Sequence, residues 1–205
     1  MISKKLLFNS TILSLPGLIS IFVSLLAIPI HLKIAGIENY GNYIMFHLIL
    51  TISFLINIGI SKSIVISINN FPKHREEVAF EGVKYTLFVC FFVFSFLILS
   101  LLFFQEILGN EKIFFIKYCS LGVIISLFYL CFEGIFLGNE KFKFSSLFNF
   151  IFYSLALSIP SLVLIFFQNL SLENLIIISL IIKLFTIISM IFLLIQMMRH
   201  TQGNI

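Results

Sequence analysis

Aspartate and tryptophan are absent from this chain of 205 residues, and charged residues make up only 11% of it. A soluble domain carries about 25% charged residues. The lack of aspartate excludes Asp-rich metal motifs for prenyl pyrophosphate chemistry, His/Asp acyl-transfer pairs and aspartyl proteolysis. The four histidines are scattered, and no acid–base or nucleophile set converges. The sequence therefore predicts a protein that is not an enzyme.

Cysteine is scarce as well. Cys90, Cys119 and Cys131 all fall inside apolar stretches and have no ligand spacing, so the sequence predicts neither a disulfide framework nor a metal site, and no cofactor. The basic residues, which give a pI near 9.0, lie mostly in short segments between apolar runs. Membrane topology and anionic lipid explain basic residues in such places, so nucleic acid is not expected as a partner.

Apolar residues dominate what remains. Hydrophobic residues make up 60% of the chain, phenylalanine alone occurs 27 times, and the mean hydropathy is +1.14. Because a spanning helix needs about 20 apolar residues, the sequence predicts an all-α integral membrane protein. Helices are predicted over 11–32, 44–68, 85–104, 113–137, 146–167 and 175–197. The polar connections are short, so residues 1–205 are expected to form a single six-helix transmembrane lobe without a soluble domain.

The distribution of lysine and arginine predicts the orientation. If the N-terminus is cytoplasmic, the outer segments contain only Lys33 and Lys112. The inner segments then contain Lys4, Lys5, Lys73, Arg75, Lys84, Lys141, Lys143 and Arg199. Basic residues favour the cytoplasmic side, so both termini are expected there.

Small and polar residues recur on one face of most predicted helices. In the first helix these are Ser10, Ser14, Gly17, Ser20, Ser24 and His31. We interpret such stripes, and the GxxxG pair Gly134 and Gly138, as helix-packing surfaces. His31 is expected to be an interfacial polar residue. The 85–104 helix, rich in Phe, is expected to be peripheral and to face lipid. Pro16, Pro29 and Pro160 each free a backbone carbonyl and allow a bend.

Ionisable residues inside predicted helices are expensive in lipid and indicate function. Lys62 lies roughly 10 Å from the cytoplasmic end of its helix, and Glu133 lies at a comparable level. Either a structural Lys62–Glu133 ion pair or a functional role explains them, and the lysine is also able to reach toward the interface. Lys183 lies deeper, and no acidic residue of another helix matches its level. It is the best candidate for a cation that faces a water-filled cavity.

A family resemblance rests on several of these residues together. Pro16 opens the first predicted helix, Ile28-Pro29 closes it, and a G-x-E-x-Y-G loop follows at 36–41. A small-residue turn with a polar patch follows at 59–63, and EGIFLGNEKFKFSSLFNF joins two later helices. With these features the chain resembles O-antigen and capsular repeat-unit flippases, the polysaccharide-exporter branch of the multidrug/oligosaccharidyl-lipid/polysaccharide superfamily.

The resemblance implies transport in the bacterial inner membrane. Such proteins are thought to move an undecaprenyl-pyrophosphate-linked oligosaccharide from the cytoplasmic to the outer leaflet, through a cationic cavity between two six-helix lobes. Lys62, Lys183, Asn57 and Glu133 are then the candidate substrate-binding residues. The implied partners are the lipid-linked oligosaccharide, membrane lipids, a second six-helix lobe, and a polysaccharide polymerase with glycosyltransferases.

Two departures from the family pattern leave alternatives open. Many relatives carry an acidic residue where this chain has Asn57, and the family is about twice as long, so the chain corresponds to its N-terminal half. One alternative is a membrane scaffold, or a half-transporter without transport activity. The other is a drug or lipid exporter of the same superfamily.

Overall fold

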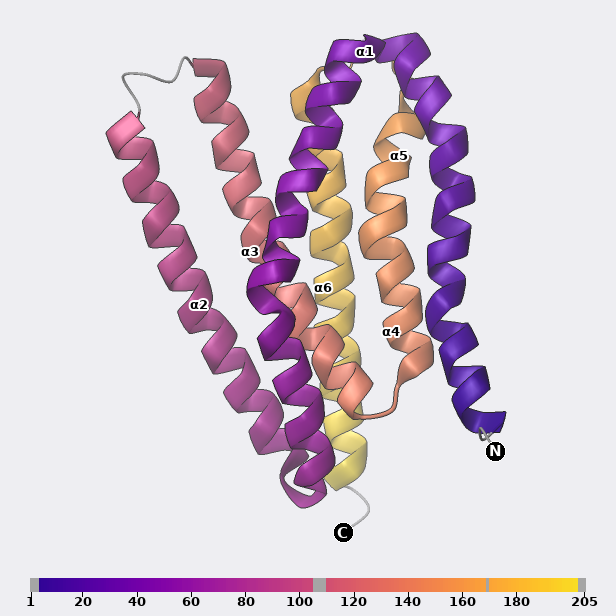
Figure 1. Ribbon diagram of the computed structural model, residues 1–205, viewed down its shortest axis with the longest axis vertical. Helices are drawn as coiled ribbons and strands as arrows, with labels where there is room; N and C mark the ends of the chain where they lie inside the picture. The colour runs from indigo at the N-terminus through magenta and orange to yellow at the C-terminus, as the bar shows by residue number, and fades with distance from the viewer. Residues whose placement is uncertain (1–3, 105–109, 169, 203–205) are drawn as a thin grey trace. The chain divides into compact units, whose positions relative to one another are not determined.

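The computed structural model describes residues 4–104, 110–168 and 170–202, with side chains over 11–51, 59–99, 116–168 and 170–197. The described residues form helices without a strand, which confirms the predicted all-α class (Figure 1). The elements in chain order are α1 (Lys4–Asn70), the 3-10 turn η1 (Pro72–His74), α2 (Arg75–Phe104), α3 (Asn110–Gly138), α4 (Phe142–Asn149), the π-helical segment η2 (Phe150–Leu155), α5 (Ala156–Val163) and α6 (Leu172–Gln202).

Several helices are long and apolar enough to cross a membrane. Within the described residues there are five: Thr11–Thr51, Pro72–Leu99, Ile116–Gly138, Phe142–Val163 and Leu172–Met197. They fit a multi-pass membrane protein. The sequence predicts six spans, and the difference arises in α1, where the connection expected at 33–43 is helical except at Gly36.

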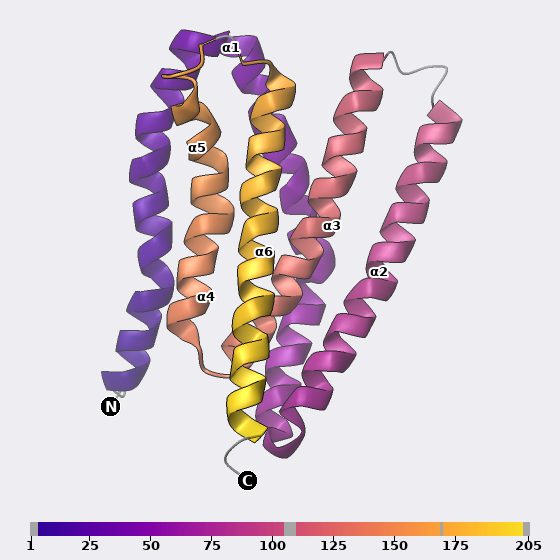
Figure 2. The ribbon, with the colours of Figure 1, turned by 180° about the vertical axis from the view of Figure 1, so that it is seen from behind.

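A single residue breaks α1. Gly36 has φ 84° and ψ 167°, a conformation that is essentially restricted to glycine. The rings of His31 and Tyr43 lie 5.2 Å apart across this break. A straight helix would separate these two residues by about 18 Å along its axis. The chain therefore folds back at Gly36, as Figures 1 and 2 show, and α1 is a helical hairpin with a first limb (4–35) and a second limb (37–70).

The chain divides into two compact units. Unit 1 comprises Met1–Met45 and Glu140–Ile205, and unit 2 comprises Phe46–Asn139. In unit 1, α4, η2 and α5 follow one another as one continuous rod, with α6 beside it (Figures 1 and 2). The first limb of α1 packs on the same rod, because Ser146 of α4 donates a hydrogen bond to the carbonyl of Ile12.

Unit 2 contains the rest of α1 together with η1, α2 and α3. Its glycines mark where helices approach closely. A Cβ added at Gly134 would lie 2.9 Å from the Ser61 carbonyl oxygen, and one added at Gly138 would lie 2.9 Å from the Ile68 side chain. Both glycines lie against the second limb of α1, as the interpretation of Gly134 and Gly138 as a packing motif expects, and at Gly134 the obstructing atom is a backbone oxygen that cannot easily shift.

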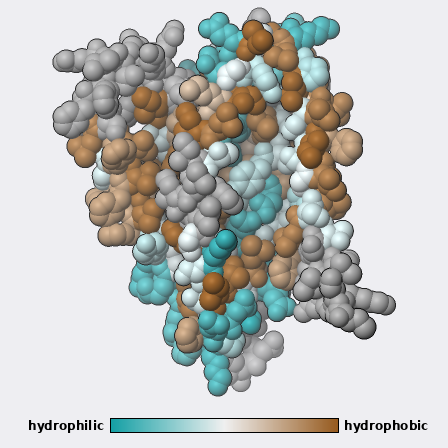
Figure 3. Space-filling view, in the orientation of Figure 1, coloured by the Kyte–Doolittle hydropathy of each residue, from teal (hydrophilic) through white to brown (hydrophobic). Residues whose placement is uncertain are grey.

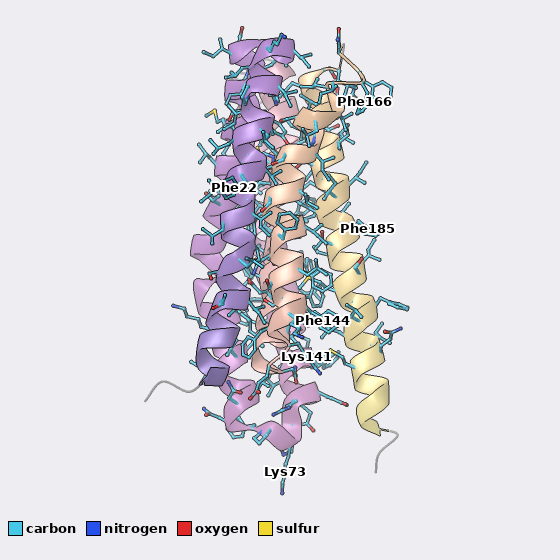
Figure 4. The ribbon with its side chains drawn as sticks, turned by 90° about the vertical axis from the view of Figure 1, so that its right-hand side faces the viewer. Phe22, Lys73, Lys141, Phe144, Phe166 and Phe185 are labelled. Atoms are coloured by element: carbon cyan, nitrogen blue, oxygen red, sulfur yellow. The ribbon has the colours of Figure 1, made fainter. Side chains whose placement is uncertain are left out.

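The exposed surface is rich in large apolar side chains. Phe22 on α1, Phe166 after α5 and Phe185 on α6 are 69%, 80% and 64% exposed, and all three are labelled in Figure 4. Hydrophobic residues cover much of the face drawn in Figure 3. The expected peripheral position of the 85–104 segment agrees with α2, which exposes Phe88, Phe91, Phe92 and Phe96. Such a surface suits hydrocarbon rather than water.

Candidate functional site

The predicted site residues are divided between the two units. Lys62 is exposed on the second limb of α1, and Glu133 is half-buried on α3, both in unit 2. Lys183 lies on α6 in unit 1. Asn57 lies within α1, but its side chain is outside the described residues.

Lys183 is enclosed by protein. It is only 2% exposed, although the sequence predicts that it faces a water-filled cavity. Its Nζ atom donates a hydrogen bond of 3.2 Å to the Phe152 carbonyl oxygen. The same atom lies 3.9 Å from the centroid of the Phe152 ring and 5.6 Å from that of Tyr153. A lysine ammonium has three donors, and this carbonyl is its one acceptor among the described residues. No carboxylate there pairs with it.

The Phe152 carbonyl is available because of the π-helical segment. The Ala156 N–H donates to the Ile151 carbonyl five residues earlier. In an α-helix it would donate to residue i−4, which is Phe152. Lys183 thus takes the place of a backbone donor that η2 has shifted by one residue. Segments of this kind occur frequently at functional sites.

Tyr43 supplies a replacement hydrogen-bond donor for a carbonyl that Pro160 frees. Proline has no N–H, so Pro160 leaves the Ala156 carbonyl without its helical donor. The Tyr43 hydroxyl lies 3.2 Å from that oxygen and 2.9 Å from the Leu157 carbonyl oxygen. It also hydrogen-bonds to Ser179 of α6. The hydroxyl therefore connects the α1 hairpin with both α5 and α6.

A third carbonyl that lacks its helical donor also receives a hydrogen bond from another helix. Pro16 removes the helical donor of the Ile12 carbonyl. Ser146 donates to that oxygen at 2.6 Å. Prolines in membrane helices are tolerated where neighbouring helices supply the missing hydrogen bond. The positions of Pro16 and Pro160 in the sequence identify the freed carbonyls. The donors come from distant helices and leave no sequence signal.

His31 is buried rather than interfacial, so that prediction is wrong. Its side chain is fully enclosed, because the fold-back at Gly36 brings Tyr40 and Tyr43 over the end of the first limb. Its Nδ1 atom lies 2.7 Å from the Ser161 hydroxyl oxygen. Its Nε2 atom and the buried Ser158 hydroxyl have no hydrogen-bond partner among the described residues.

These side chains form one buried polar set in unit 1, which we call the polar interior. It comprises His31, Tyr43, Ser158, Ser161, Ser179 and Lys183. Most of its members are hydrogen-bonded, and the unpartnered atoms among them are His31 Nε2 and Ser158 Oγ, which are costly in an apolar medium. The set offers a cation and hydroxyl donors, which suit an anionic or hydroxyl-rich ligand. No group of three His, Cys, Asp or Glu side chains that could hold a metal occurs in the described part of the chain.

Comparison of the chain with protein-family models, with curated proteins and with solved structures finds no match.

Proposed function

We propose that this protein is a six-span lobe of a bacterial inner-membrane flippase, with both termini cytoplasmic. It moves an undecaprenyl-pyrophosphate-linked oligosaccharide from the inner to the outer leaflet. The observation that carries the proposal is Lys183, a cation buried in a membrane-length helix with one neutral acceptor among the described residues.

The energetic argument starts from what Lys183 costs. A charged side chain at the centre of a membrane helix costs about 2.5–3.5 kcal/mol on insertion scales. A methionine would occupy similar space without that cost and would lose the hydrogen bond to the Phe152 carbonyl and the contact with the Phe152 ring, and well-packed apolar replacements of buried ions are often stabilising. A lysine in such a place is therefore better explained by a ligand than by stability. A pyrophosphate, which cannot cross hydrocarbon unaided, is a ligand that repays the cost.

Lys62 supports an entry point on the same route. It lies on an exposed face of the second α1 limb that also carries Gly59, Ser63, Ile66, Asn69 and Asn70, while Ile64 and Ile68 on the opposite face are buried. The lysine, serine and asparagine side chains on this face suit water, a headgroup or another protein helix better than lipid tails. This face is where we expect the headgroup to arrive and a second six-helix lobe to oppose the first. A polymerase and glycosyltransferases are the expected wider partners.

The test measures binding of a polyprenyl pyrophosphate to the full chain in nanodiscs of neutral lipid. We expect Lys183→Met to weaken binding about 10- to 100-fold, since a hydrogen bond to a charged group contributes about 1.5–3 kcal/mol. Lys62→Met should weaken it less, because that lysine is exposed and screened by water. The control is Lys84→Met, which removes an exposed lysine already paired with Glu81 at 2.8 Å.

Unchanged affinity in Lys183→Met would refute the proposal. Equal binding of the corresponding polyprenol, which lacks the pyrophosphate, would favour an exporter of neutral lipids instead. Transport itself is checked in vesicles by the accessibility of a labelled lipid-linked oligosaccharide to a membrane-impermeant reagent. That assay includes both the chain alone and the chain at densities that allow two copies to pair.

A further inference from the structure

We propose that Lys183 keeps η2 π-helical through its hydrogen bond to the Phe152 carbonyl, an arrangement that we call the latch. The pyrophosphate headgroup and the Phe152 carbonyl compete for the same ammonium, so that binding of the headgroup releases η2 into the α-helical register. The inference rests on the proposed function and adds a coupling between binding and helix conformation.

The first step is that Lys183 cannot bind a headgroup where it stands. Its side chain is 2% exposed, and the Phe152 ring covers Nζ at 3.9 Å. A pyrophosphate on a polyprenyl chain is too large to enter this enclosed position. To contact it, the ammonium has to leave both the ring and the Phe152 carbonyl. The carbonyl and the headgroup are thus alternative partners.

The second step concerns the carbonyl that is left behind. Phe152 is fully buried, so departure of the ammonium takes a hydrogen bond from its carbonyl in an apolar surrounding. The donor to this carbonyl in an α-helix is the Ala156 N–H, which now binds the Ile151 carbonyl. A shift of this N–H by one residue restores the i→i−4 pattern and removes the π-helical turn.

The third step is what such a shift moves. Adding or removing one residue from a helix rotates everything beyond it by about 100°. Beyond η2 lies α5 with Ser158 and Ser161, and Ser161 holds His31. Tyr43 holds the Ala156 and Leu157 carbonyls at the start of α5. Binding at Lys183 is thereby transmitted to every contact that α5 makes with the α1 hairpin.

The experiment places 4-fluorophenylalanine at position 152 and records the ¹⁹F resonance of the full chain in nanodiscs. The Lys183→Met variant gives the resonance of a ring without an ammonium above it. We expect saturating polyprenyl pyrophosphate to move the wild-type resonance to within about one linewidth of that reference, since the ammonium at 3.9 Å polarises the ring. The polyprenol should leave the resonance unchanged. Binding is measured in the same samples by ³¹P line broadening.

The outcomes separate the two proposals. Binding without movement of the ¹⁹F resonance overturns the latch and leaves the proposed function intact. Absence of binding overturns both. Inorganic pyrophosphate is the third ligand, and movement with it but not with the lipid would overturn a lipid headgroup as the releasing anion.

A second variant tests the competition without touching the lysine. Phe152→Leu keeps the carbonyl and removes the ring that holds the ammonium. We expect it to bind polyprenyl pyrophosphate about fivefold more tightly, because one partner of the latched state is gone. The matched control is Phe166→Leu, which changes a phenylalanine that is 80% exposed just beyond α5 (Figure 4). Unchanged or weaker binding in Phe152→Leu would overturn the latch.

Discussion

The hydrogen bond from Tyr43 to the carbonyl that Pro160 frees allows a quantitative test by double-mutant cycle. Tyr43→Phe keeps the ring and removes the hydroxyl, which leaves the fully buried Ala156 with an unsatisfied carbonyl. Pro160→Ala restores an N–H four residues beyond Ala156. The two substitutions should therefore interact, because the second supplies the donor whose absence makes the first costly.

The magnitude follows from the contacts. An unsatisfied buried acceptor costs about 1–3 kcal/mol, while hydrogen bonds measured between membrane helices average about 0.6 and reach about 1.7. We expect Tyr43→Phe to lower the free energy of unfolding by about 1.5 kcal/mol in the wild-type chain. With Pro160→Ala the loss should fall to about 0.5 kcal/mol, since the hydroxyl then serves only Leu157 and Ser179. The coupling is about 1 kcal/mol.

The assay is equilibrium unfolding in mixed micelles of rising SDS fraction. Because the chain has no tryptophan, helix content by circular dichroism at about 222 nm is the signal. The control is Tyr85→Phe, which removes a hydroxyl from an exposed tyrosine of α2 and should be additive with Pro160→Ala. Additivity of Tyr43→Phe with Pro160→Ala, within about 0.5 kcal/mol, would refute the assignment of Tyr43 as the replacement donor.

Three further outcomes are expected. Gly134→Ala should lower the free energy of unfolding by about 1–3 kcal/mol, because its methyl group would meet the Ser61 carbonyl oxygen at 2.9 Å. Gly17→Ala should have no such cost, because nothing lies within 4 Å of the added methyl group. Equal unfolding midpoints for the two variants would contradict this. Gly36→Ala should cost about 1–3 kcal/mol through its φ of 84°, whereas Gly41→Ala in the helical second limb should be nearly neutral in the same assay; a neutral Gly36→Ala would show that the turn is not held there. In a chain freed of its native cysteines, Ile37→Cys should react with an impermeant maleimide from outside intact cells and Lys141→Cys only after permeabilisation, and labelling of both from one side would exclude the six-span arrangement.

Local residue patterns predicted part of this architecture. The apolar runs gave the helical class, and the spacing of Gly134 and Gly138 identified a close helix contact, because both are properties of neighbouring residues. The position of Pro160 likewise shows that the Ala156 carbonyl, four residues earlier, has no helical N–H donor. The donor to that carbonyl is 113 residues away in the chain, so no local pattern indicates Tyr43.

Two features could not be read from hydrophobic periodicity. The π-helical segment spans six residues, too few for a shift of one residue to change the pattern visibly. Burial of His31 depends on the turn at Gly36, which brings Tyr40 and Tyr43 back over it. The sequence predicts a polar residue near a helix end, and only the direction of the following helix decides whether that residue meets water or protein.

The division of unit 1 into two stretches of sequence has a consequence for biosynthesis. Residues 46–139 belong to unit 2, so the ribosome completes that unit before it makes α4, α5 and α6. His31 therefore enters the bilayer well before Ser161, which follows it by 130 residues. The helix that contains Lys183 is made after Phe152, so its charge arrives where a carbonyl acceptor already exists.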